Sequence, residues 1–166
     1  MPITIHPMEA ADWTAVAQIY ADGIATGEAT FETAVPAWEK WDSGHLPTCR
    51  FVARSVESGE VVGWAALSPV SSRCVYTGVA EVSVYVVPAA WGQGVGKRLL
   101  QTLVGSSEAE GIWTLQAGIF PENEASVKLH EKCGFRVVGR RERLGQQNGR
   151  WRDVLFLERR SQTVRT

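Results

Sequence analysis

A turn with three glycines, at residues 91–97, constrains the fold of this chain more than any other feature of its sequence. It follows a strand-like apolar segment that stops at Pro88, and it leads into a segment with apolar residues at helical spacing. Glycines allow positive φ and close approach of a ligand, while a helix start offers unpaired N–H groups and a positive dipole end. Such a turn suits a pyrophosphate, and Lys97 and Arg98 add positive charge nearby.

The same turn has a second explanation, in which the glycines only permit tight packing between a strand and a helix. The motif by itself does not decide between the two. It is not a P-loop, because no Gly-Lys-Ser/Thr ending follows at the required spacing. Nor is it a dinucleotide-binding fingerprint, because the final glycine of that motif would fall at Leu99. A different phosphate-bearing ligand is therefore expected.

The composition is typical of one globular domain. Apolar residues make up 45% of the 166 residues and the formal net charge is −1, so no excess of positive charge points to nucleic acid. The sequence shows no secretory leader and no apolar run of about 18 residues that would cross a membrane. We expect a single domain over residues 1–160, followed by a frayed tail at residues 161–166.

Cysteine and histidine are scattered along the sequence. The cysteines stand at positions 49, 74 and 133 and the histidines at 6, 45 and 130, so neither type forms a local cluster. This spacing argues against a disulfide framework and against a zinc site, and we predict no metal. A reducing cytoplasm is the simplest setting for such a chain.

Periodicity predicts a mixed, mostly antiparallel sheet with helices on both faces. In the strand at residues 79–87, Glu81, Ser83 and Tyr85 alternate with valines and should share one face. Asp12 is expected to cap the first helix, Pro36 to start the second, and Asn123 to cap the last. The Asn148-Gly149 pair predicts a hairpin. Further strands are predicted at residues 3–5, 50–56, 61–68, 113–120, 135–143 and 151–157, and a helix at residues 95–104.

Several of these segments together resemble a known family. The order and spacing of five segments are similar to the acetyl-CoA core of the GNAT superfamily of N-acetyltransferases: residues 84–86, 92–96, 95–104, 123–126 and 129–135. Three more resemble its phosphinothricin and methionine sulfoximine acetyltransferase branch: residues 29–33, 80–86 and 149–154. The resemblance implies a GNAT fold in which two neighbouring strands splay apart to admit acetyl-CoA.

The resemblance also assigns the cofactor contacts. Backbone groups of Val84 and Val86 would pair with the pantetheine arm, as an added strand pairs with a sheet edge. Asn123 would contact the cofactor near its thioester. The glycine turn would hold the pyrophosphate, with contacts from Gly92, Gln93, Gly94, Val95, Gly96 and Lys97. The predicted set also includes Tyr85 and Ser126. Without the resemblance, the valines are ordinary core residues and Asn123 is a helix cap.

Glu81 is the candidate general base. An acceptor ammonium has a pKa near about 10, so a base must take a proton before the nitrogen attacks. The related branch places a glutamate at this point, acting through water, and His130 matches a histidine with a supporting role in proton transfer or positioning. Backbone N–H groups near residues 82–84 would stabilise the oxyanion. The alternatives are a surface carboxylate for Glu81 and a structural histidine.

The acceptor pocket is predicted from both loops and strands. Phe31, Val75 and Tyr76 would supply apolar walls, and Arg73 would pair with the carboxylate of an amino-acid-like acceptor. Arg150 and Trp151 would close the pocket. Each of these residues has an ordinary alternative as loop packing or a solvated charge.

The chain departs from the family pattern at two positions, and the acceptor remains open. Trp91 stands where the family has Arg or Gln, which suggests weaker electrostatics or altered CoA packing at the turn but no loss of binding, and Gln147 stands where it has Lys. The expected partners are a small-molecule amine and, from the resemblance, a second copy of the chain in a homodimer. The alternatives are a protein N-terminus, polyamine or aminoglycoside as acceptor, and a CoA-sensing module without catalysis.

Overall fold

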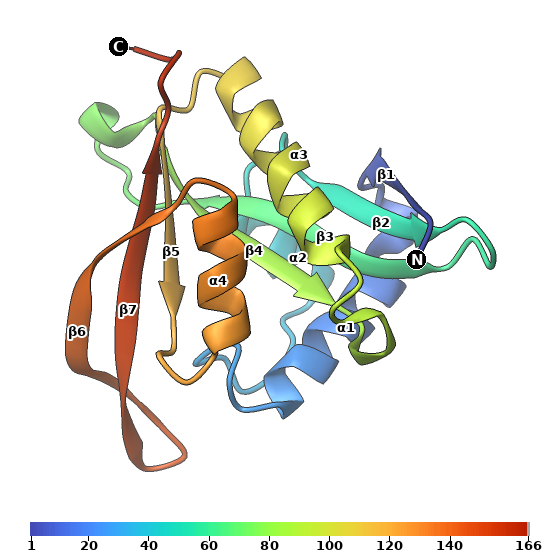
Figure 1. Ribbon diagram of the computed structural model, residues 1–166, viewed down its shortest axis with the longest axis horizontal. Helices are drawn as coiled ribbons and strands as arrows, with labels where there is room; N and C mark the ends of the chain where they lie inside the picture. Colours follow the sequence, from blue (N-terminus) through green and yellow to red (C-terminus); the bar gives the residue numbers. More distant parts are fainter. Residues whose placement is uncertain (166) are drawn as a thin grey trace.

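The computed structural model describes residues 1–165 and contains one seven-stranded sheet with helices on both faces (Figure 1). The strands are β1 Ile3–Pro7, β2 Phe51–Ser55, β3 Val61–Pro69, β4 Val79–Val86, β5 Thr114–Ile119, β6 Arg136–Gln147 and β7 Arg150–Arg160. The helices are α1 Trp13–Ala25, α2 Trp38–Gly44, α3 Val95–Ala109 and α4 Glu124–Lys132. Short 3-10 turns lie at Ala10–Asp12, Cys74–Tyr76 and Pro88–Ala90.

The strand order is β1-β2-β3-β4-β5-β7-β6, and every neighbouring pair is antiparallel except β4 and β5. β4 and β5 run parallel because α3 connects them as a crossover helix. The predicted mixed, mostly antiparallel sheet is confirmed. A single parallel junction in the middle of the sheet is the place where a ligand site is expected.

Two apolar layers hold the helices on the sheet. On one face, Leu99, Leu100 and Leu103 of α3 are completely buried against the sheet. On the other face, Val16 of α1 and Trp41 of α2 belong to a separate buried cluster. Figure 1 shows α3 and α4 in front of the sheet and α1 and α2 behind it. The alternation predicted for β4 is confirmed, because Tyr85 packs with the α1 cluster and its valine neighbours pack with the α3 cluster.

The predicted hairpin is confirmed, and its geometry explains the sequence. Asn148 and Gly149 form the two-residue connection between β6 and β7, with φ of 50° and 78°. Positive φ at both positions is the requirement of a type I′ turn, which Asn-Gly satisfies at the lowest cost.

Two local predictions, for Asp12 and Pro36, were wrong. In the predicted tail at residues 161–166, the first residue is buried and hydrogen-bonded. The Asp12 side chain does not cap α1: it accepts a bond from the N–H of Glu9, 2.9 Å away, in the preceding 3-10 turn. The second helix begins at Trp38 with Ala37 as its cap, not at Pro36. Ser161 is buried and its N–H donates to Trp113 O at 2.8 Å. Thr166, the end of that tail, lies outside the described residues.

Candidate active site

A gap opens between β4 and β5 partway along the two strands. Their pairing covers Val79 to Glu81 on β4 and Thr114 to Gln116 on β5, and it ends there, although β4 continues to Val86. β5 also continues, but it pairs only with β7 over its remaining residues. The central sheet therefore separates at the level of Glu81.

The backbone of β4 turns free hydrogen-bonding groups into this gap. The N–H of Val87 donates to Val62 O at 2.9 Å, which makes Val87 a hydrogen-bonded partner of β3. Because bonded and non-bonded positions alternate along an antiparallel pair, Val84 and Val86 direct their N–H and C=O groups away from β3. Both residues thus face the side on which β5 no longer pairs. This is the backbone arrangement that an extended ligand requires to add itself as a strand.

A cavity of about 410 Å³ lies at this separation, and we call it the β4–β5 cavity. Its walls come from residues 29–32, residues 81–85 and residues 116–120, together with facing side chains of α4, β6 and β7. It brings together seven residues predicted from the sequence: Phe31, Glu81, Val84, Tyr85, Asn123, Ser126 and His130. The volume is in the usual range for a small-molecule site.

Glu81 stands at the point where the two strands part. It is the last residue of β4 paired with β5, and its partly exposed carboxylate lines the cavity. The Nε2 of Gln116 lies 3.5 Å from Glu81 Oε1, at the long limit of a hydrogen bond. The carboxylate is therefore placed in the cavity with one weakly held oxygen, and it is accessible to water or to an amine.

His130 is buried beside the same cavity, at 5% exposure. Its Nδ1 lies 2.7 Å from the backbone oxygen of Ser126, so Nδ1 carries the proton and Nε2 is left as an acceptor. The ring packs edge-on against Phe135, with centroids 5.2 Å apart. Burial lowers the pKa of His130 below 6.5 and outweighs the opposing bond to Ser126. The imidazole is consequently neutral at neutral pH.

Asn123 caps α4 and at the same time joins it to a distant loop. Its Oδ1 accepts from the N–H of Ser126 at 3.3 Å, and its Nδ2 donates to Glu28 O at 3.2 Å. The prediction that Asn123 caps this helix is confirmed. The side chain also lines the cavity, and its contact with a cofactor stays a prediction.

The glycine turn leads into α3 on the exposed surface. Gly92 and Gly94 have φ of 73° and 82°, and a Cβ on either would meet nothing within 4 Å, so backbone conformation and not space requires glycine here. Gly96 differs, because its Cβ would lie 3.2 Å from a methyl group of Leu129. The turn combines a conformational requirement with a packing requirement. The first N–H groups of α3 have no intrahelical acceptor because they lie at the helix start. Gly94, the N-cap, has no side chain that could accept from them.

Trp91 takes up one of the groups that β4 presents to the gap. Its indole Nε1 donates to Val86 O at 2.8 Å, while the ring remains 57% exposed. Arg98, which was expected to add charge to the turn, instead donates to Ile3 O at 2.9 Å. Lys97 is left as an exposed cation in the first turn of α3.

The remaining predicted acceptor residues do not line the β4–β5 cavity. Val75 and Tyr76 belong to an exposed 3-10 turn, and the guanidinium of Arg73 lies over the Tyr76 ring at 5.4 Å. Arg150 and Trp151 start β7 beside the hairpin tip, where the Trp151 side chain is 55% exposed. Their roles in acceptor binding stay predictions.

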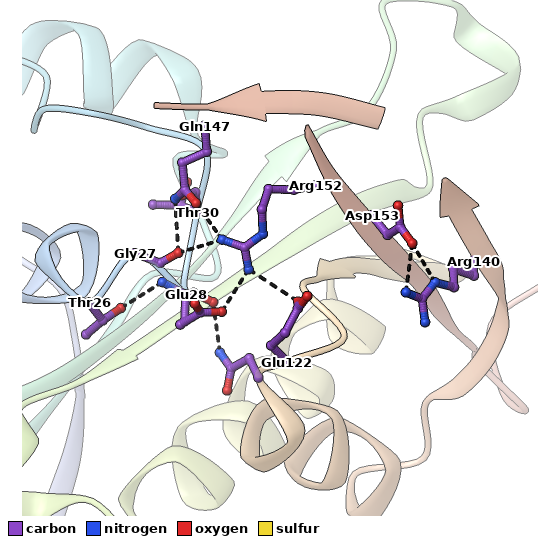
Figure 2. Close-up of polar contacts among 10 residues, drawn as sticks. Thr26, Gly27, Glu28, Thr30, Glu122, Arg140, Gln147, Arg152 and Asp153 are labelled. Atoms are coloured by element: carbon purple, nitrogen blue, oxygen red, sulfur yellow. Dashed lines mark hydrogen bonds and ion pairs between the residues drawn. The ribbon is translucent and has the colours of Figure 1, made fainter. Parts of the chain in front are cut away.

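Sequence reasoning missed the polar residue that is most deeply buried near the cavity. Arg152 of β7 is 3% exposed, and it forms ion pairs with Glu28 at 2.8 Å and Glu122 at 3.2 Å (Figure 2). Its guanidinium lies 4.0 Å from the centroid of Phe120. The sequence did contain a signal, because Arg152 alternates with Val154 and Phe156, both of which line the cavity. Arg141, unlike Arg152, lines the cavity itself, and it too was not singled out.

Tyr85 forms the wall of the cavity behind Glu81. Its ring stacks on Trp64 with centroids 4.9 Å apart and lies 5.0 Å from Tyr20. Burial raises the pKa of the Tyr85 hydroxyl far above its usual value, and the neighbouring Tyr20 adds to the rise. This phenol is therefore neutral and serves as a rigid wall.

Within residues 1–165, no three His, Cys, Asp or Glu side chains are grouped so that they could hold a metal ion. The helices of the same residues include none that is long and apolar enough to cross a membrane.

Comparison with known proteins gives a consistent result. The sequence pattern of the family described as "Acetyltransferase (GNAT) family" matches residues 13–135. A phosphinothricin N-acetyltransferase of Streptomyces coelicolor is 41% identical over 108 residues, which are 65% of this chain and 63% of that protein. An L-methionine sulfoximine/L-methionine sulfone acetyltransferase of Pseudomonas paraeruginosa is 32% identical, with 95% of this chain and 94% of that protein covered.

A solved structure agrees with the sequence relatives. A GNAT superfamily phosphinothricin acetyltransferase from Sinorhizobium meliloti, in complex with AcCoA, superposes with a TM-score of 0.86 at 29% identity. The superposition covers 99% of this chain and 96% of the other. The similarity therefore extends over both strands that border the gap.

Proposed function

Because the chain belongs to the GNAT acetyltransferase family and is an N-acetyltransferase, we propose that it moves an acetyl group from acetyl-CoA to the amine of a small amino-acid-like acceptor. Phosphinothricin and methionine sulfoximine are the acceptors that its relatives' names suggest. The observation that carries the proposal is the gap at Glu81, where free backbone groups and a carboxylate face one cavity.

The residues beside the gap fit acetyl-CoA. Val84 and Val86 turn backbone groups into the gap, of which the Val86 carbonyl is bonded to the Trp91 indole, and the start of α3 presents N–H groups next to two glycines with positive φ. The first set suits the amides of a pantetheine arm, and the second suits a pyrophosphate. When bound, acetyl-CoA supplies a thioester carbonyl that an amine can attack.

Glu81 is proposed to take the proton from the acceptor ammonium. A carboxylate within reach of a cavity-bound amine, directly or through one water, satisfies the geometric requirement for a general base. His130 is proposed to support this step. Its neutral ring has a free Nε2 acceptor, and the bond from Nδ1 to the Ser126 carbonyl fixes its tautomer.

The acceptor's carboxylate is proposed to bind a guanidinium. Arg141 lines the cavity on the β6 side, opposite the β4 wall that holds Glu81. A carboxylate matches a guanidinium in a bidentate arrangement, whereas a polyamine has no such group. Phe31, which packs edge-on against Phe120 at 4.9 Å, supplies the apolar wall for a short side chain.

The test is an assay of thiol release from acetyl-CoA with a panel of acceptors. Phosphinothricin, methionine sulfoximine and methionine sulfone should accelerate release, while N-acetylphosphinothricin, which lacks a free amine, should not. Acceleration by peptides or spermidine alone would replace the proposed acceptor class. If coenzyme A binds in calorimetry and no amine accelerates release, catalysis itself is contradicted.

We further propose a homodimer that forms through the C-terminal strands. β6 is an edge strand, and Val137, Val138 and Leu144 on it are 41–46% exposed. Apolar side chains on an uncovered edge favour contact with a partner. Sedimentation equilibrium should give twice the chain mass, and a Val138→Lys change should lower it towards the monomer.

A further inference from the structure

Arg152 joins three parts of the chain that are far apart in sequence. Its guanidinium donates to the carbonyl of Gly27 at 3.0 Å and to the carboxylate of Glu28 at 2.8 Å. It also pairs with Glu122, in the turn between β5 and α4, and donates to the side-chain oxygen of Gln147 on β6. Figure 2 shows these groups converging on one guanidinium.

This arrangement is costly, so apolar packing alone does not account for it. A buried charge loses its hydration, and partners recover that loss only when the geometry is good. Arg152 Nε is buried, and it has no hydrogen-bond partner among the described residues. Apolar side chains of similar volume often replace buried ion pairs without loss of stability. The buried guanidinium of Arg152 is better explained by a role in holding other parts of the chain in position.

The group that Arg152 positions is the loop wall of the β4–β5 cavity. Residues 26–35 contain no helix or strand beyond the end of α1, so side-chain contacts must set their path. Gln147 Nε2 donates to Gly27 O at 3.0 Å and to Thr30 O at 3.2 Å, which supports the same loop. Gln147 is itself oriented by its bond from Arg152. The residues held in this way lie immediately before Phe31 and Glu32, which line the cavity.

We propose that Arg152 is a positioning residue for the acceptor: it holds residues 27–32 as the acceptor-facing wall and does not act on acetyl-CoA. This inference rests on the proposed function. Arg152 acts through the loop, because it is not itself among the residues that line the cavity. Its substitution should therefore change acceptor binding and leave the cofactor side of the gap unchanged.

The experiment compares Arg152→Met, Arg152→Lys and the control Arg140→Gln. Arg140 pairs with Asp153 at 2.7 Å but is 55% exposed and does not line the cavity. Arg152→Met should raise the acceptor KM about tenfold or more with kcat within about threefold, the pattern of lost uniform binding. The acetyl-CoA Kd from calorimetry should stay within about twofold, and Arg152→Lys should recover part of the KM, since the charge is kept. Arg140→Gln should match the wild type.

Amide hydrogen exchange supplies a readout that does not depend on turnover. In Arg152→Met, amides of residues 27–32 should exchange at least about tenfold faster, while those of α3 should not change. If the wild type acetylates no amine, the proposed function fails, and this exchange still decides the role of Arg152. Unchanged exchange and unchanged KM would overturn the inference.

A purely structural role would give a different pattern. A joint loss of acceptor binding, acetyl-CoA binding and thermal stability in Arg152→Met would contradict a role confined to the acceptor. Should that variant fail to fold, Glu28→Gln provides the test, because Glu28 is 45% exposed and its change removes one ion pair without opening the core. It should raise the acceptor KM by a smaller factor and leave the acetyl-CoA Kd unchanged; no effect on KM would count against the proposal.

Discussion

The two ends of the gap between β4 and β5 are built from different groups. Beside α3, the gap is bordered by backbone atoms of Val84 and Val86 and by a turn whose glycines adopt positive φ. At the cavity end, side chains of Glu81, Phe31 and Arg141 converge from separate elements. The backbone end depends on chain conformation, including the positive φ of Gly92 and Gly94, more than on the chemistry of side chains, whereas the cavity end depends on individual side chains. The acceptor is therefore the partner that can change most easily during evolution.

The largest effect should come from Glu81→Gln, at the cavity end. Removing the proposed general base should lower kcat by about 10² or more, because proton transfer loses its acceptor. The acetyl-CoA Kd should stay the same, since the backbone of β4 is unchanged. Steady-state kinetics with methionine sulfoximine checks this, with Glu57→Gln in the exposed β2–β3 turn as control. An unchanged kcat would remove Glu81 from the mechanism.

At the backbone end, Gly94→Ala should weaken acetyl-CoA binding. The residue has φ of 82°, which disfavours an L side chain by about 1–2 kcal/mol, so alanine should shift the free turn away from the binding conformation and raise Kd about tenfold. At saturating acetyl-CoA, kcat should change little. Gly105→Ala is the matched control, because Gly105 lies in α3 with open space around it and should stabilise the helix by about 0.5–1 kcal/mol. Equal acetyl-CoA Kd values for the two variants would contradict a ligand role for the turn.

Trp91→Arg tests whether side chains matter at all at the backbone end. An arginine near the start of α3 could pair with the pyrophosphate and should tighten acetyl-CoA binding by two- to fivefold, corresponding to about 0.4–1 kcal/mol for an exposed ion pair. The gain should shrink at high salt. Trp91→Phe removes only the donor to Val86 O and serves as the comparison. A salt-independent change in calorimetric Kd would point to the lost indole contact instead.

The last prediction is about stability and not about catalysis, and it concerns His130, which lies in the cavity wall on α4. Burial lowers the pKa of His130 in the folded protein below the unfolded value of 6.5. Between these two values the unfolded chain binds more protons, so the free energy of unfolding falls as pH falls below about 6.5. Burial also lowers the pKa of His45, which contributes in the same direction.

His130→Gln should remove the His130 share of this pH dependence. Urea unfolding at pH 7.5 and pH 5.5 should show a smaller drop in the variant than in the wild type, by about 1 kcal/mol per unit of pKa difference. The sign is the critical part of the test. A larger drop in the variant would mean that the folded protein favours the charged imidazole.

The sequence predicted correctly those features of the structure that neighbouring residues determine. The Asn148-Gly149 turn, the alternation along β4 and the glycine turn before α3 each follow from a few neighbouring residues. Six of the seven predicted site residues that meet in one cavity lie on β4 or at α4 and its cap, elements with clear local signals, whereas Phe31 lies in the irregular loop after α1. Asp12 failed as a cap because the helical path begins earlier, at the 3-10 turn.

What the sequence did not reveal depends on long-range contacts. Arg152 and Glu28 are separated by 124 positions, and nothing near either residue predicts that they meet. Gln147 is a polar residue beside a turn, which is common and predicts no particular contact. Its bonds to Gly27 and Thr30 form only when the loop lies against β6. The departures from the family pattern at Trp91 and Gln147 were visible, but their consequences required the fold.

The proposed base and the backbone groups proposed to bind the cofactor are consecutive parts of β4. A strand advances by about 3.3 Å per residue, so Glu81 and Val84 are kept about 10 Å apart along the chain by covalent structure alone. Inserting one residue between them would lengthen this interval and turn every later side chain to the opposite face of the sheet. Length variation among descendants of this chain should therefore gather in the exposed segment at residues 72–77 and be missing from residues 79–86.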